Sequence, residues 1–163
     1  MKTLMLIRHG AAQIQSGLND FDRPLTTSGV ENSLSLGQFI LESKNIPDLI
    51  ISSTAKRAKG TAENIIKGGK LGSDLLFEDS IYGGNSSFLL YLLSEQKNSY
   101  NNICLVGHEP HFSNFIYNIT NKKNFIFETA NLVIIKLNIK KWENVNYKKG
   151  RILLIIKPNE LKL

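Results

Sequence analysis

The sequence predicts an α/β fold, a single three-layer domain with helices on both faces of a mostly parallel sheet and an antiparallel edge from the C-terminal strands. Short continuous apolar runs at 3–7, 48–52 and 102–107 are typical of strands buried on both faces. Segments with helical periodicity separate these runs, and such alternation indicates parallel βαβ units. Two further apolar segments, 131–138 and 150–156, follow one another across a polar connection, which is typical of an antiparallel pair.

The chain has 163 residues, and we expect one domain over 1–163 because this length suffices for a single core. Apolar residues make up 42% and charged residues 21% of the chain, which excludes disordered and fibrous proteins. The longest apolar runs are far shorter than the roughly 20 residues that span a bilayer. The N-terminus lacks the features of a secretory signal. We therefore expect a cytoplasmic monomer that does not bind membranes.

Two helices are predicted in the first half of the chain. The first is indicated by helical spacing of Val30, Leu34, Gly37 and Leu41, and the preceding stretch SGVE (28–31) predicts a capping box at its start. The second is indicated by a similar apolar series, and the pair GG at 68–69 predicts its end. The residues of the series are Ala55, Ala58, Ala62, Ile65 and Ile66.

Two more helices are predicted in the second half. An apolar run at 88–93 follows Ser86, and a second series runs from Phe112 to Ile119. Pro110 stands just before that series, where the first turn of a helix tolerates proline.

The single cysteine excludes an internal disulfide and a cysteine phosphatase, and the positive charge is confined to the C-terminal part of the chain. Cys104 is the single cysteine, so the chain contains no internal disulfide, and the stretch CLVGHEPHF that follows lacks the arginine a cysteine phosphatase needs to hold phosphate. The net charge of +6 comes from the C-terminal part, because residues 122–163 hold ten lysines and arginines against three acidic residues. We interpret these cations as solvated loop residues.

Chemically active side chains follow three of the predicted strands. Arg8, His9 and Gly10 follow the first strand, Arg57 lies just after the second, and His108 follows the third. Because the carboxyl ends of parallel strands share one edge of a sheet, these side chains are predicted to converge there.

Two arginines and two histidines at one edge point to phosphoryl chemistry. Arginine forks match phosphate oxygens. A neutral imidazole can attack phosphorus, provided its other nitrogen is held, typically by a backbone carbonyl. Gly10 would leave room for the substrate's approach.

The stretches LIRHG, SSTAKRAKGTAE and LVGHEPHF occur in the order that is characteristic of the histidine phosphatase superfamily, and the chain resembles this family from residue 3 to about 120. Within that span DFDRPLTTSG (20–29) and the short chain resemble the small phosphohistidine phosphatases typified by SixA. This resemblance implies the same α/β fold.

The resemblance also implies roles for individual residues. His9 would be phosphorylated transiently and then hydrolysed by water, without metal or cofactor. Arg8 and Arg57 would hold the phosphoryl oxygens, and His108 would be a further donor. Arg23 matches an arginine of the SixA-like pattern and would add a contact.

The sequence departs from larger family members that supply a carboxylate as general acid. The corresponding stretch, LLFEDSIYGGNSS, contains Glu78 and Asp79 without the family pattern around them. Phosphohistidine releases imidazole, which needs less acid assistance than an alkoxide. We therefore expect a phosphatase acting on phosphohistidine in a signalling or phosphotransfer protein. The alternative is a phosphatase of small phosphomonoesters with Glu78 or Asp79 as acid.

A second alternative is a noncatalytic module that binds phosphate or nucleic acid. Its basis is the arginine cluster together with lysines 140, 141, 148 and 149. The chain lacks the interleaved aromatic and basic residues of a single-strand reader, so we expect no nucleic-acid partner. His111 is interpreted as structural or as lining the rim of the site. A zinc site of three histidines is disfavoured because two arginines would repel the cation.

Overall fold

In the computed structural model, which describes residues 1–161, the chain folds around one six-stranded sheet of order β3-β2-β4-β1-β5-β6. Strands β1 to β4 are parallel, β5 is antiparallel to β1, and β6 is antiparallel to β5. This confirms the predicted parallel sheet with an antiparallel C-terminal edge. The strands are β1 (Lys2–Arg8), β2 (Leu49–Ser52), β3 (Asp74–Phe77), β4 (Asn102–Gly107), β5 (Leu132–Leu137) and β6 (Gly150–Ile156).

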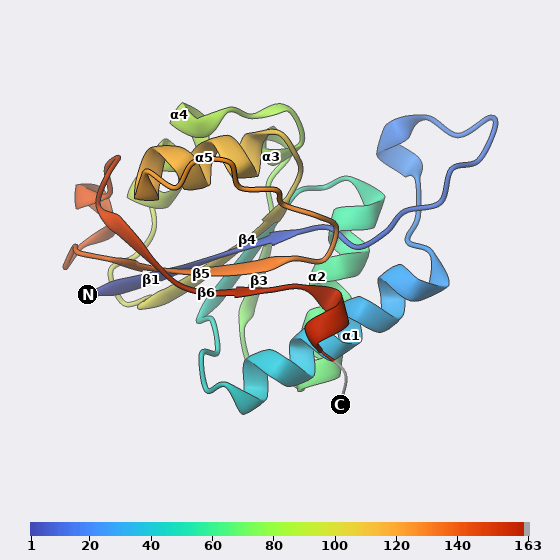
Figure 1. The fold of residues 1–163 in the computed structure, drawn as a ribbon, viewed down its shortest axis with the longest axis horizontal. Coiled ribbons are helices and arrows are strands. Elements are labelled where there is room, and N and C mark those ends of the chain that lie inside the picture. Colours follow the sequence, from blue (N-terminus) through green and yellow to red (C-terminus); the bar gives the residue numbers. More distant parts are fainter. Residues whose placement is uncertain (162–163) are drawn as a thin grey trace.

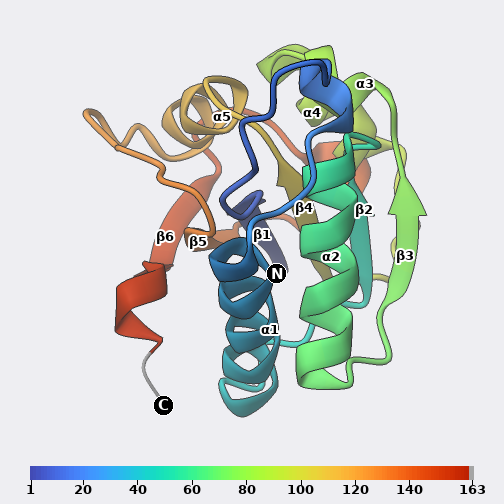
Figure 2. The ribbon, with the colours of Figure 1, turned by 90° about the vertical axis from the view of Figure 1, so that its right-hand side faces the viewer.

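Helices cover both faces of the sheet, as predicted. On one face lie α1 (Thr27–Glu42) and α2 (Lys56–Gly69), side by side in Figure 2. On the other lie α4 (Ser86–Ser94), α5 (His111–Thr120) and the short α3 (Ser80–Gly83), seen above the sheet in Figure 1. Three 3-10 turns complete the elements: Asp20–Asp22, Trp142–Asn144 and Pro158–Glu160.

Strand β1 is buried on both faces, which explains its continuous apolar run. Leu4 and Leu6 belong to the core cluster shared with α4 and α5, whereas Met5 and Ile7 belong to the cluster shared with α1 and α2. This alternation follows from the two-residue period of a strand. The double burial holds β1 rigidly between the layers and therefore fixes the position of the residues that follow it.

The first helix does not begin with the predicted capping box. Thr26, rather than Ser28, is the N-cap residue, and its Oγ1 accepts a hydrogen bond of 3.0 Å from the Gly29 amide. The helix therefore starts one residue earlier than SGVE and includes it. Threonine and serine are both good N-cap residues, so local composition did not separate the two positions.

The predicted end of the second helix at GG is confirmed, because Gly69 is the last residue of α2. The C-cap residue is Lys70, whose φ of 49° is left-handed. Gly69 faces Gly37 of α1 so closely that a Cβ at either position would collide with the backbone of the other helix. These glycines allow the two helices to pack backbone against backbone.

Strand β3 was not predicted as a separate strand. It has four residues, and three of them are exposed at the edge of the sheet. Short edge strands carry little apolar signal, which is why the sequence pattern did not reveal it.

Strands β1, β2 and β4 end at the same edge of the sheet, where Arg8 pairs with Gly107 and Ser52 with Val106. Segment 9–26 leaves β1 at this edge and extends away from the sheet before entering α1 (Figure 1). The basic connection 138–149 lies at the opposite edge, because Leu137 pairs with Lys2. Within residues 1–161, the helices are all too short or too polar to cross a membrane.

Candidate active site

His9 follows β1 and is almost completely buried, with 6% of its surface exposed. Its Nδ1 lies 2.7 Å from the carbonyl oxygen of Gly10. Since a carbonyl only accepts, the proton is on Nδ1 and the lone pair is on Nε2. That lone pair accepts a hydrogen bond of 3.1 Å from Nε of Arg57. The nitrogen that would attack phosphorus is thus deprotonated and oriented.

Arg57 lies in the first turn of α2 and is buried. Its guanidinium connects three parts of the site. Nε donates to His9, Nη2 lies 3.4 Å from Nδ1 of His108, and Nη1 and Nη2 donate to Asp20. A fork with this many donors suits tetrahedral oxyanions.

His108 follows β4, and its ring centroid lies 5.1 Å from that of His9. Its Nε2 lies 2.8 Å from Oγ of Ser53, the first residue after β2. Nδ1 faces the Arg57 donor, so the proton belongs on Nε2. Ser53 was missed in the sequence, although it stands at a strand's carboxyl end, the position used to select the other residues.

Both histidines are held in the neutral form. Burial lowers the pKa of His9 to about 4, and the guanidinium groups of Arg57, Arg8 and Arg23 act in the same direction, against the raising effect of the Gly10 bond. The pKa of His108 is lowered to about 3, chiefly by burial, and His9 and Arg57 act in the same direction. A neutral imidazole at His9 is the nucleophilic form.

Gly10 connects β1 to α2, because its amide donates to Oγ1 of Thr61 at 2.9 Å and that hydroxyl donates to the Arg57 carbonyl. A Cβ at Gly10 would lie 2.9 Å from the carbonyl oxygen of Gly29 in α1. Close packing against α1 is therefore a structural reason for glycine here. A contact of Gly10 with substrate stays a prediction.

Arg8 lies beside this cluster rather than within it. Its Nη1 donates to the carbonyl of Phe127 at 2.9 Å, and its buried Nε has no hydrogen-bond partner among the described residues. A buried donor without a partner is uncommon. The guanidinium retains hydrogen-bonding capacity, and its predicted grip on a phosphoryl group stays a prediction.

Arg23 reaches the site through Asp20, which the sequence reading did not single out. Nε and Nη2 of Arg23 lie 3.1 and 2.9 Å from Oδ1 of Asp20. The hydroxyl of Tyr82 in α3 donates to Oδ2 of Asp20 at 2.6 Å. The Tyr82 ring packs edge-on against His108 at 5.3 Å. The three-residue spacing of Asp20 and Arg23 in the sequence could have predicted this ion pair. No sequence pattern could have predicted the contact of Tyr82.

The remaining candidates lie outside the cluster. Glu78 accepts a hydrogen bond from the Ser80 amide at the start of α3, and within residues 1–161 neither Glu78 nor Asp79 is hydrogen-bonded to His9, Arg57 or His108. His111 lines a separate cavity of about 370 Å³ between α4 and α5. Within residues 1–161, no three His, Cys, Asp or Glu side chains lie together so that they could hold a metal ion.

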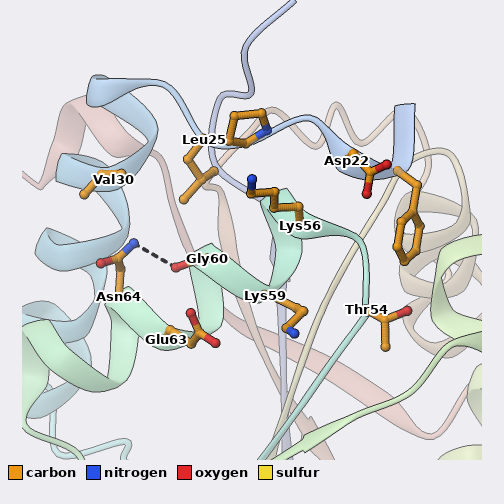
Figure 3. A pocket seen from close by; sticks show the side chains of 11 residues that line it. Asp22, Leu25, Val30, Thr54, Lys56, Lys59, Gly60, Glu63 and Asn64 are labelled. Carbon is orange, nitrogen blue, oxygen red and sulfur yellow. Dashed lines mark hydrogen bonds between the residues drawn. The ribbon is translucent and has the colours of Figure 1, made fainter. Parts of the chain in front are cut away.

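A cavity of about 590 Å³ is lined by residues of the segment before α1, of α1 and of α2 (Figure 3). Leu25 and Val30 form part of its lining, and Lys56, Lys59 and Glu63 supply charged groups. Arg57 follows Lys56 in the first turn of α2 but is not part of this lining.

Residues 4–77 match the family model of the histidine phosphatase superfamily (branch 1). The Mycobacterium tuberculosis protein Rv1276c is 23% identical over 104 residues, which are 64% of this chain and 63% of that protein. The chain thus spans less than two thirds of this relative's length.

The fold is that of SixA proteins. The SixA structure from Agrobacterium tumefaciens matches 96% of this chain and 98% of its own, with a TM-score of 0.82 and 24% identity. The protein histidine phosphatase SixA in complex with tungstate matches 98% and 99%, with a TM-score of 0.81 and 22% identity. The family model thus matches the part of the chain that contains His9 and Arg57, and the fold of SixA extends over nearly the whole chain.

Proposed function

We propose that this protein is a phosphatase in which His9 accepts the phosphoryl group and that its substrate is phosphohistidine on a signalling or phosphotransfer protein. The observation that carries the proposal is the state of His9: a buried, neutral imidazole with Nδ1 bonded to Gly10 and Nε2 directed at Arg57. SixA proteins of the same fold support the choice of substrate.

The reaction takes two steps. In the first, the lone pair on Nε2 of His9 forms a bond to phosphorus, the bond from phosphorus to the substrate nitrogen breaks, and the leaving imidazole takes up a proton from solvent. In the second, water attacks phosphorus, the bond to His9 breaks, and inorganic phosphate and a proton are released. Arg57 and Arg8 balance the charge on the phosphoryl oxygens. His108 donates to a phosphoryl oxygen only after its Nε2 proton leaves Ser53 or its Nδ1 is protonated.

The surroundings of Glu78 and Asp79 favour phosphohistidine over small phosphomonoesters. An alkoxide leaving group requires a proton donor within hydrogen-bond reach. Glu78 accepts a hydrogen bond at the start of α3, and among the described residues neither carboxyl is hydrogen-bonded to the cluster. An imidazole leaves without that donor. The single, free Cys104 agrees with a reducing cytoplasm as the place of action.

The test compares the wild type with His9→Asn on three substrates: a phosphohistidine protein, an aryl phosphate and an alkyl phosphate. We expect turnover of the phosphohistidine protein by the wild type and a loss of at least about 1,000-fold in His9→Asn. The wild type should form an acid-labile phosphoenzyme that His9→Asn lacks.

His111→Asn is the matched control, because His111 lines another cavity, and it should keep most of the activity. Full activity in His9→Asn would contradict the proposal. Preferred turnover of the alkyl phosphate, abolished by Glu78→Gln or Asp79→Asn, would instead support the phosphomonoester alternative.

A further inference from the structure

The carboxylate of Asp20 occupies the donors that a phosphoryl group would need. Oδ2 accepts from Nη2 of Arg57 at 3.0 Å and from the hydroxyl of Tyr82 at 2.6 Å. Oδ1 accepts from Nε and Nη2 of Arg23 at 3.1 and 2.9 Å. Three side chains from separate parts of the chain thus converge on one anion of the chain itself.

The main-chain carbonyl of Asp20 accepts a hydrogen bond from Nη1, the other terminal nitrogen of Arg57. Nη1 of Arg57 donates to the Asp20 carbonyl oxygen at 2.7 Å. With Nη1 and Nη2 both engaged, the guanidinium is held with its third donor, Nε, on Nε2 of His9. The attacking lone pair of His9 is therefore covered while Asp20 is in place.

We propose that Asp20 is an internal substitute for the phosphoryl group, which the substrate must displace from Arg57 and Arg23 before His9 can attack. The proposal rests on the proposed function, because it concerns the same phosphoryl-binding arginines. Displacement frees two oxyanion donors of Arg57 and allows its Nε to leave the lone pair of His9. The carboxylate of Asp20 thus makes access to the site selective for anions that compete strongly for arginine.

The segment that carries Asp20 is suited to moving. The 3-10 turn Asp20–Asp22 has no buried residue, and the Asp20 side chain is 52% exposed. The turn is held locally by Asn19, whose side chain accepts from the Asp22 amide. A single antiparallel bridge between Ala12 and Leu25 closes the base of the segment. Displacing the carboxylate therefore breaks exposed and partly buried hydrogen bonds, and no residue of the turn has to leave the core.

The experiment measures binding of tungstate and of inorganic phosphate by calorimetry, without turnover. Asp20→Asn removes the charge that competes for the arginines while keeping the size of the side chain. We expect its dissociation constant for each oxyanion to fall roughly three- to tenfold below the wild type, because the arginines are released from an internal competitor.

Asp22→Asn is the matched control. It removes the same charge from the same turn, but its carboxylate makes no hydrogen bond or ion pair in the described chain. It should bind both oxyanions with the wild-type affinity. An equal tightening in both variants would mean that net charge alone acts, which would overturn the proposal.

Tyr82→Phe provides an independent second variant, because it removes the 2.6 Å bond that holds Oδ2 and leaves the Asp20 charge intact. It should also tighten oxyanion binding, by less than Asp20→Asn. If instead Asp20 serves to hold Arg57 in a productive orientation, both variants would bind oxyanions more weakly, and the proposal would be wrong.

Failure of this inference and failure of the proposed function give different results. Equal binding by the wild type and Asp20→Asn, with normal turnover of phosphohistidine, would reject the role of Asp20 and leave the phosphatase intact. No binding of either oxyanion by any variant would reject the phosphoryl site itself.

Discussion

His9 and His108 are imidazoles whose protonation the surrounding chain controls at both ring nitrogens. Gly10 and Arg57 hold His9, while Ser53 and Arg57 hold His108. A single guanidinium thus donates to both rings. This arrangement keeps two neutral histidines side by side at a pH where solvent-exposed histidine is partly charged.

The pKa of His9 can be measured directly. We expect its Cε1–H resonance to titrate with a midpoint near pH 4, because burial and the nearby guanidinium groups disfavour the charged form. The measurement is a two-dimensional NMR titration of the wild type, with the resonance assigned by its loss in His9→Asn. A midpoint near 6.5 would show that the ring is solvated and that the buried geometry is wrong.

The residue types and their positions in the sequence predicted the cluster of His9, Arg57 and His108, with Arg8 beside it. Each of the four stands at the carboxyl end of a strand or shortly after it. Asp20 and Tyr82 were not predicted, because their importance comes from contacts across 37 and 62 residues of chain. Long-range partners of this kind leave no local pattern.

At the scale of elements, the start of α1 positions the segment that carries Asp20. Thr26 caps the helix through Gly29 and also donates to the carbonyl of Ala11 at 3.3 Å. The bond to Ala11 attaches the helix start to the residues just after His9. The cap therefore contributes to the placement of the site as well as to the stability of the helix.

Thr26→Ala should lower the free energy of unfolding by about 1 kcal/mol, the usual cost of losing an N-cap side chain. Ser28→Ala, which removes a hydroxyl inside the first turn, should cost less than half of that. Urea denaturation of both variants checks the prediction. A larger loss of stability in Ser28→Ala than in Thr26→Ala would instead support the capping box predicted at 28–31.

Elements with strong periodicity were predicted from sequence, and so was the end of α2 at the pair GG. Glycine commonly ends helices, but here Gly69 also allows α1 and α2 to touch. This second role depends on what lies opposite the glycine. That information exists only in the packed structure.

At the scale of the whole molecule, the two buried histidines couple stability to pH. Their pKa values are about 4 and 3 when folded, against about 6.5 in an unfolded chain. Between these values the unfolded state binds more protons, so stability rises with pH. The full contribution is present above pH 6.5 and is lost as pH falls through the folded pKa values.

We therefore expect the free energy of unfolding to fall from pH 6.5 to pH 5, with up to about 1.4 kcal/mol per pH unit from each histidine. Asp20 does not contribute in this range, because its hydrogen bond from Tyr82, with those from the arginines, lowers its pKa to about 2. Urea denaturation at several pH values measures the slope. The double variant His9→Asn/His108→Asn should have a distinctly shallower slope; an unchanged slope would assign the pH dependence to other groups.

The sequence by itself determined the layers of the fold, the parallel sheet with its antiparallel edge, and the placement of Arg8, His9, Arg57 and His108 at one edge of that sheet. Burial periodicity and strand-end position are local, and they suffice for these features. Only the tertiary structure decided that Asp20 is bonded to Arg57, that Arg57 donates to Nε2 of His9, and that within residues 1–161 neither Glu78 nor Asp79 is hydrogen-bonded to the cluster. Those relations depend on which loops meet at the sheet's edge, and contact between distant segments is a property of the packed molecule.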